Sequence, residues 1–183
     1  AAVKGRDFAG HADHAETIRP IGRHLDRQHD TAFDGLNAFH LGAAERQALG
    51  QSHNFIRHPD MPRSIFKLMW DTISAGQELF AYVVNRAMNG DHYWVYAHVT
   101  PSFNKAGDII GYHSNRREPG RQILEQDIIP FYAQLRDVEA SAGSPKQALA
   151  AGSEAIGACL ARHNVEYDEF ICTLGQGQRR GYR

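Results

Sequence analysis

The sequence predicts an α+β fold, with an antiparallel β-sheet flanked by short helices and followed by a helical appendage. Three observations support this prediction. The apolar residues change from helical spacing to strict alternation near residue 78. Two turn signatures, NGD at 89–91 and NKAGD at 104–108, divide the alternating region into three strands. Helical spacing then returns after residue 120 and continues almost to the C-terminus.

Composition sets limits on the class of protein. The length of 183 residues suits one compact domain with some flanking structure. The 20 Lys and Arg residues nearly balance the 21 Asp and Glu residues, and no long run of either sign occurs. This balance argues against nucleic acid or an anionic membrane as the main partner. No apolar run approaches the ~20 residues that cross a bilayer, so no membrane segment is expected.

The location is expected to be cytoplasmic. No charged region followed by an apolar segment resembles a secretory signal. Cys159 and Cys172 are the two cysteines, and they form no CxxC pair. Two cysteines are too few for a disulfide scaffold, which favours a reducing compartment.

The N-terminal third is the hardest part to assign. Residues 1–30 show neither clean alternation nor a sustained helical stripe, and residues 16–26 fit an interrupted strand pair or a poor helix. Whether they supply the first strands of the sheet stays open. Apolar residues at three- and four-residue steps predict a helix from Thr31, and the segment 42–49 predicts a second short one.

The central region is more regular. A proline at position 62 and an apolar stripe predict a helix over 63–75, ended by Gly76. Three strands are then expected in a meander, at 78–87, 92–100 and 109–117. The type I′ turn favoured by Asn-Gly would join the first two.

The C-terminal region predicts helices. A helix is expected over 121–140, with a kink or a boundary at Pro130 because proline cannot donate to the preceding turn. Ser144 and Pro145 suit the N-cap and first position of a helix that runs to His163. The segment 166–174 is read as a further helical turn or a docking segment, and the tail 175–183 is expected to be disordered.

The stretch HNFIRHPDMP at 53–62 is the most chemically dense part of the chain. Its two prolines stiffen the backbone before the helix. Arg57 offers a planar fork of donors for a phosphate or a carboxylate, and His58 can donate to a ligand carbonyl. Asp60 can cap the following helix. The alternative interpretation is a self-contained turn, in which Arg57 pairs with Asp60 and His58 caps the turn.

Catalysis and metal binding receive little support. No nucleophile lies beside a base and a third orienting group, and no Walker-type loop occurs, so the chain is not expected to be an enzyme. Histidine is frequent, with 11 residues. His92, His98 and His113 could supply a haem ligand, although His92 and His98 also fit a sheet face covered by helices or water.

The motifs RHPDMP, NGDHYWV and GY.S.R together carry a resemblance. Between Leu49 and Arg117 the chain resembles the PAS domain of bacterial aerotaxis receptors and soluble PAS proteins of that subfamily. The YDEF segment resembles a C-terminal extension on some single-PAS members. The resemblance implies a PAS fold, a non-covalently bound flavin adenine dinucleotide (FAD) and a role in reporting redox or oxygen status, as in aerotaxis and chemotaxis.

Carried over by position, the resemblance implies a set of cofactor-binding residues. These are Arg57, His58, Asp60, Phe66, Asn85 and Trp94. The chain departs from the flavin-binding receptors at Leu79, where they carry a tryptophan, and Phe80 is adjacent. The pattern that opens the family's PAS core also has altered spacing here.

We therefore divide the chain into the poorly assigned segment 1–30, a PAS sensory core at 31–118, a C-terminal helical extension at 119–174 and the tail 175–183. The main hypothesis is a sensory module that binds FAD and signals to a protein partner, or as a homodimer, through the C-terminal helices. The alternatives are a cofactor-free PAS dimerisation or adaptor domain and a haem-binding gas sensor.

Overall fold

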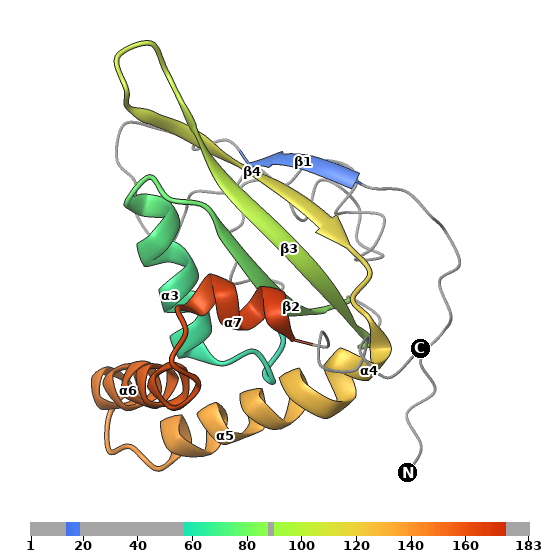
Figure 1. Ribbon diagram of the computed structural model, residues 1–183, viewed down its shortest axis with the longest axis vertical. Coiled ribbons are helices and arrows are strands. Elements are labelled where there is room, and N and C mark those ends of the chain that lie inside the picture. The colour runs from blue at the N-terminus through green and yellow to red at the C-terminus, as the bar shows by residue number, and fades with distance from the viewer. Residues whose placement is uncertain (1–13, 19–56, 88–89, 175–183) are drawn as a thin grey trace.

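The chain builds a four-stranded antiparallel sheet with strand order β1-β4-β3-β2 (Figure 1). The structure is a computed structural model that describes residues 14–18, 57–87 and 90–174. The strands are β1 (His14–Ile18), β2 (Leu79–Arg86), β3 (His92–Phe103) and β4 (Ile109–Arg117). The α+β class and the three-stranded meander of the prediction are confirmed.

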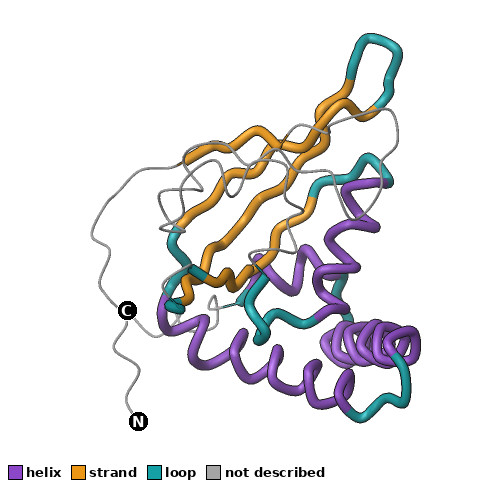
Figure 2. The backbone as a smooth tube through the Cα atoms, turned by 180° about the vertical axis from the view of Figure 1, so that it is seen from behind, coloured by secondary structure: helices purple, strands orange, loops and turns teal. Residues whose placement is uncertain are grey.

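Helices lie on both faces of the sheet and along its lower end (Figures 1 and 2). α3 packs on one face, and α7 crosses β2 on the other. α6 packs against both α3 and α5. The helices are α3 (Arg63–Ser74), α4 (Arg121–Ile123), the π-helical segment η2 (Leu124–Ile128), α5 (Ile129–Ala140), α6 (Pro145–His163) and α7 (Tyr167–Thr173).

β1 is a strand that the periodicity of residues 1–30 did not define. It pairs with β4 in a register that runs from His14 opposite Arg116 to Ile18 opposite Tyr112. Tertiary pairing, rather than local alternation, therefore places this segment in the sheet. The two short helices predicted from Thr31 and at 42–49, and the tail, lie outside the described residues.

Both hairpins of the meander turn on a glycine with positive φ. Gly90 has φ 89° and Gly107 has φ 87°. The Gly90 N–H donates to the carbonyl of Ala87, so glycine takes the fourth position of that turn. In the second hairpin, the Gly107 N–H donates to the carbonyl of Asn104. The predicted hairpin at 89–91 is confirmed, but its hydrogen bonds fit a three-residue loop closed by a glycine bulge rather than the two-residue type I′ turn.

The predicted boundary at Pro130 is confirmed. α4 continues into η2, and α5 then begins with Pro130 in its first turn. Proline has no N–H to give to the turn before it, so a widened π turn at this point costs less than elsewhere in the helix. Ile128, at the end of η2, is fully buried and anchors the junction in the core.

The outer face of the sheet, opposite α3, is covered by the C-terminal helices. The Tyr132 hydroxyl of α5 donates to the carbonyl of Tyr82 on β2 at 2.6 Å. The Tyr132 ring also contacts Trp94 on β3, with a centroid distance of 5.8 Å. Ile171 of α7 is 1% exposed and belongs to the same core. The helices after residue 120 therefore complete the hydrophobic core of the sheet.

We expect Ser144→Ala to lower the free energy of unfolding by about 1 kcal/mol. The Ser144 side chain accepts a hydrogen bond from the Gln147 N–H at 3.3 Å and so caps α6, as the sequence predicts. Urea unfolding followed by circular dichroism measures the effect. Ser153→Ala, at an exposed position inside the same helix, is the matched control and should be neutral or slightly stabilising. Equal losses for both variants would contradict the capping role.

Candidate ligand site

A cavity of about 30 Å³ lies between α3 and the facing side of the sheet. The helix contributes four apolar side chains at i, i+3, i+4 and i+7, namely Phe66, Met69, Trp70 and Ile73. The sheet contributes alternate residues of β2, β3 and β4, because successive side chains of a strand point to opposite faces. Trp70 meets Tyr112 of β4 edge-to-face at 5.7 Å. The walls are therefore mainly apolar and aromatic.

Three polar side chains interrupt this apolar lining. Asn85 of β2 is 2% exposed and lines the cavity. On β4, the Arg116 Nε donates to the Ser114 Oγ at 3.3 Å. Burying an amide costs free energy, and a ligand that forms a hydrogen bond with it would offset that cost. An apolar cavity with a few convergent polar groups is typical of a small-molecule site.

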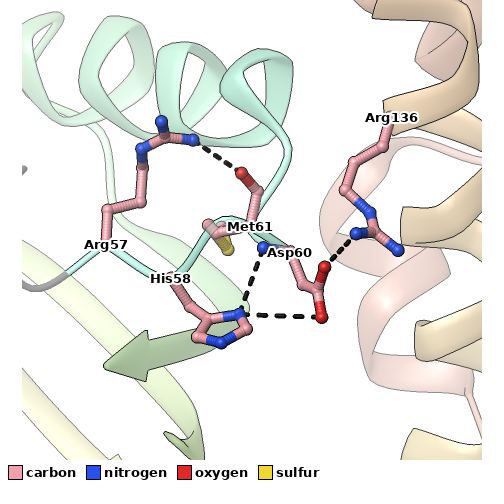
Figure 3. Close-up of polar contacts among 5 residues, drawn as sticks. All are labelled: Arg57, His58, Asp60, Met61 and Arg136. Carbon is pink, nitrogen blue, oxygen red and sulfur yellow. Dashed lines mark hydrogen bonds and ion pairs between the residues drawn. The ribbon is translucent and has the colours of Figure 1, made fainter. Parts of the chain in front are cut away.

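The Arg57–Met61 loop uses its polar groups to hold its own shape (Figure 3). The Arg57 guanidinium donates to the carbonyl of Met61 at 2.8 Å. The Asp60 N–H donates to the His58 Nδ1 at 3.1 Å, so His58 accepts at this nitrogen and closes a turn. Burial is the main cause that lowers the pKa of both Arg57 and His58 below their usual values. For His58, this agrees with a neutral ring.

The loop is joined to the cavity through the backbone of β2. Arg57 forms an isolated β-bridge with Asn85, and the His58 N–H approaches the carbonyl of Val84 at 3.4 Å. The loop therefore fixes the strand that carries Asn85, although its side chains do not line the cavity.

The predicted capping role of Asp60 is wrong. No side chain at the N-cap position, Pro62, caps α3, and the Asp60 carboxylate pairs with Arg136 of α5 (Figure 3). The first amides of α3 donate instead to Glu139 of α5. The suggested Arg57–Asp60 ion pair does not form among the described residues. The Asp60 carboxylate lies near Arg136 and His58 instead.

Of the six predicted site residues, the structure places two in the cavity wall, Phe66 and Asn85. Arg57, His58 and Asp60 lie in the adjoining loop. Trp94 lies on the outer face of the sheet against Tyr132. Trp94 does not line this cavity, because the period of two places it and the cavity-lining Val95 on opposite faces.

The adjacent Phe80 does not replace the tryptophan found at the position of Leu79 in the flavin-binding receptors. Phe80 stacks on His98, with ring centroids 4.1 Å apart, and both rings lie on the outer face. Leu79 itself is 2% exposed and packs in the core. The aromatic groups near the cavity are therefore those of α3 and β4.

Sequence reasoning missed the contribution of β4. Tyr112, Ser114 and Arg116 all line the cavity, and they are the spaced residues of the GY.S.R motif. Their two-residue spacing on a predicted strand was a usable signal, since it places all three on one face.

In the described part of the chain, the sheet histidines do not gather into a metal centre. His98 pairs with Glu78 at 2.8 Å on the outer face. Across the ranges that the structure describes, no group of three or more His, Cys, Asp or Glu side chains is arranged to hold a metal ion. The same ranges contain no helix with the length and apolar character needed to cross a membrane.

Comparisons with known proteins agree with this geometry. Residues 39–116 match the family described as the PAS fold. The aerotaxis receptor of Escherichia coli (strain K12) is 45% identical over 75 residues, which are 41% of this chain and 15% of that receptor. The match thus spans a small part of the receptor. A light-oxygen-voltage domain studied with a flavin analogue superposes with a TM-score of 0.52 at 12% identity, over 71% of this chain and 89% of that domain.

Proposed function

We propose that this chain carries a PAS sensory domain that binds a flavin between α3 and the sheet and reports redox or oxygen status to a protein partner. The observation that carries the proposal is the buried Asn85 amide in the wall of an apolar cavity beside Phe66 and Trp70. A flavin ring has broad apolar faces and a polar edge, which matches such a lining. The proposed action is binding and signalling rather than catalysis.

Two relatives support the choice of ligand. The aerotaxis receptor is similar over 75 residues of this chain. The light-oxygen-voltage domain shares the fold. From the resemblance to aerotaxis receptors we propose FAD as the flavin, held non-covalently.

The size of the cavity adds a condition. A space of about 30 Å³ holds roughly two water molecules, whereas sites for drug-sized ligands measure ~300–1,000 Å³. A flavin ring would therefore enter only if α3 moved away from the sheet. The small volume also favours the second candidate function, a cofactor-free adaptor domain.

The test is an absorption spectrum of the freshly purified protein, followed by acid release and chromatography of any chromophore. Oxidised-flavin bands and released FAD would support the proposal. A Soret band would assign haem instead. A protein that is colourless and takes up no FAD on reconstitution would overturn the flavin proposal, and the adaptor function would then lead.

We expect Asn85→Ala to weaken FAD binding about tenfold, since the amide is a buried polar group in the cavity wall. Titration of the apoprotein with FAD, followed by flavin fluorescence, measures the dissociation constant. Asn115→Ala is the matched control, because Asn115 is exposed on β4 and lies on the outer face. If Asn85→Ala binds FAD with unchanged affinity, the Asn85 amide does not contact the bound flavin.

A further inference from the structure

α3 makes contacts in two directions, and each involves a different part of the helix. Its middle and C-terminal turns line the cavity through Phe66, Met69 and Trp70. Its N-terminus meets α5 and α6, which follow it by about seventy residues or more in the chain. The same rigid helix therefore touches the candidate ligand site and the C-terminal extension.

Glu139 of α5 caps the N-terminus of α3. The residue at the N-cap position is Pro62, whose side chain cannot accept a hydrogen bond. The Arg63 N–H donates to the Glu139 Oε2 at 3.0 Å, and the Ser64 N–H donates to the Oε1 at 2.8 Å. A carboxylate at this position satisfies unpaired amides and also compensates the positive end of the helix dipole. α3 thus depends on another helix for its cap.

Two further contacts reinforce this junction. Arg136 lies one turn before Glu139 on α5 and pairs with Asp60 in the loop that leads into α3 (Figure 3). On α6, a Cβ added at Gly152 would lie 2.7 Å from both the Cβ and the Oγ of Ser64. The backbone of α6 is therefore in direct contact with the first turn of α3.

We propose that Glu139 is a positioning residue that couples α3 to α5 and α6, so that a movement of α3 away from the sheet is transmitted to the C-terminal helices. We call this junction the α3 clamp (Asp60, Ser64, Arg136, Glu139 and Gly152). That a ligand supplies the movement rests on the proposed function, because the cavity accepts a ring only when α3 moves. The mechanical coupling itself does not depend on any ligand.

The first test perturbs the cavity side of α3 without a ligand. Met69→Ala removes a buried side chain from the cavity wall and leaves the clamp residues unchanged. Hydrogen exchange is then measured across residues 145–163, which form α6. In the wild-type background, Met69→Ala is expected to raise exchange there about fivefold. In the Glu139→Ala background, the additional rise is expected to disappear. A rise of equal size in both backgrounds, or none in either, would overturn the proposal.

Two controls separate coupling from stability. Pro62→Ser, added to Glu139→Ala, supplies a local N-cap and is expected to restore protection of the first turn of α3. It should not restore the response of α6, because the link to α5 is still missing. Recovery of that response would show that Glu139 acts only by stabilising α3, which contradicts the proposal. Glu154→Ala, at an exposed glutamate of α6, should leave the response intact.

The second test adds FAD to the full chain. In the wild-type protein, FAD is expected to alter the hydrogen-exchange rates of both α3 and α6. In Glu139→Ala, the rates should alter in the sheet and α3 but not in α6. If the wild-type protein binds no FAD, the proposed function fails, while the Met69→Ala comparison still decides the coupling. If FAD binds and its effect reaches α6 without Glu139, the clamp fails and the flavin proposal stands.

Discussion

Replacing Tyr132 with alanine is expected to lower the free energy of unfolding by about 3–5 kcal/mol. Tyr132 is 1% exposed, and its ring fills the space between α5 and the outer face of the sheet. The variant would lose this packing together with the hydrogen bond to the Tyr82 carbonyl. Thermal or urea unfolding, monitored by circular dichroism and by tryptophan fluorescence, measures the loss.

Two matched variants divide this effect into its parts. Tyr132→Phe keeps the ring and removes the hydroxyl, so its expected cost is about 1 kcal/mol. Val138→Ala, at a 36% exposed position on the same helix, should change stability by less than about 0.5 kcal/mol. A small effect of Tyr132→Ala would mean that the C-terminal helices are loosely attached, and it would contradict their place in the core.

Gly152→Ala is expected to destabilise the protein by about 1–3 kcal/mol, although alanine is normally the better residue inside a helix. The new methyl group would lie 2.7 Å from the Ser64 Cβ and 3.0 Å from the Glu139 Oε1. Either α6 moves away from α3 or the capping carboxylate shifts, and both weaken the α3 clamp. Chemical unfolding gives the stability, and exchange at the Arg63 and Ser64 amides reports the cap.

Gly157→Ala provides the matched control on the same helix. No heavy atom lies within 4 Å of a Cβ built at Gly157. Helix propensity should therefore dominate there, and the variant should be more stable by about 0.5–1 kcal/mol. If Gly152→Ala were stabilising to the same degree, the close contact between α6 and α3 would not exist in solution.

The sequence predicted those elements whose signal is local. Alternation defined β2, β3 and β4, and the spacing of apolar residues defined α3. Ser144 and Pro145 marked the start of α6 because capping depends on neighbouring residues. Phe66 and Asn85 were carried over by position from the resemblance, and the structure places both in the cavity wall.

The features that were missed depend on contacts between distant segments. Glu139 as the cap of α3 has no signature near residue 62, since the donor and acceptor are 75 and 76 residues apart. Asp60 was predicted as the cap because it lies nearby in sequence, yet its carboxylate has a closer partner in Arg136. Trp94 was carried over by motif position, and the face assigned by strand alternation was not applied to it.

The reliance of the sheet on late segments also has a consequence for the order of folding. Tyr82 meets its partner Tyr132 across 50 residues, and the first turn of α3 meets Glu139 across about 75. During synthesis, the contacts of α5 with the outer face of the meander, and the cap that α5 supplies to α3, form only after α5 has been made. Long loops must then close before these contacts form, which slows folding and lengthens the exposure of an apolar surface. We therefore expect nascent chains that end before residue 140 to be prone to aggregation and to depend on chaperones.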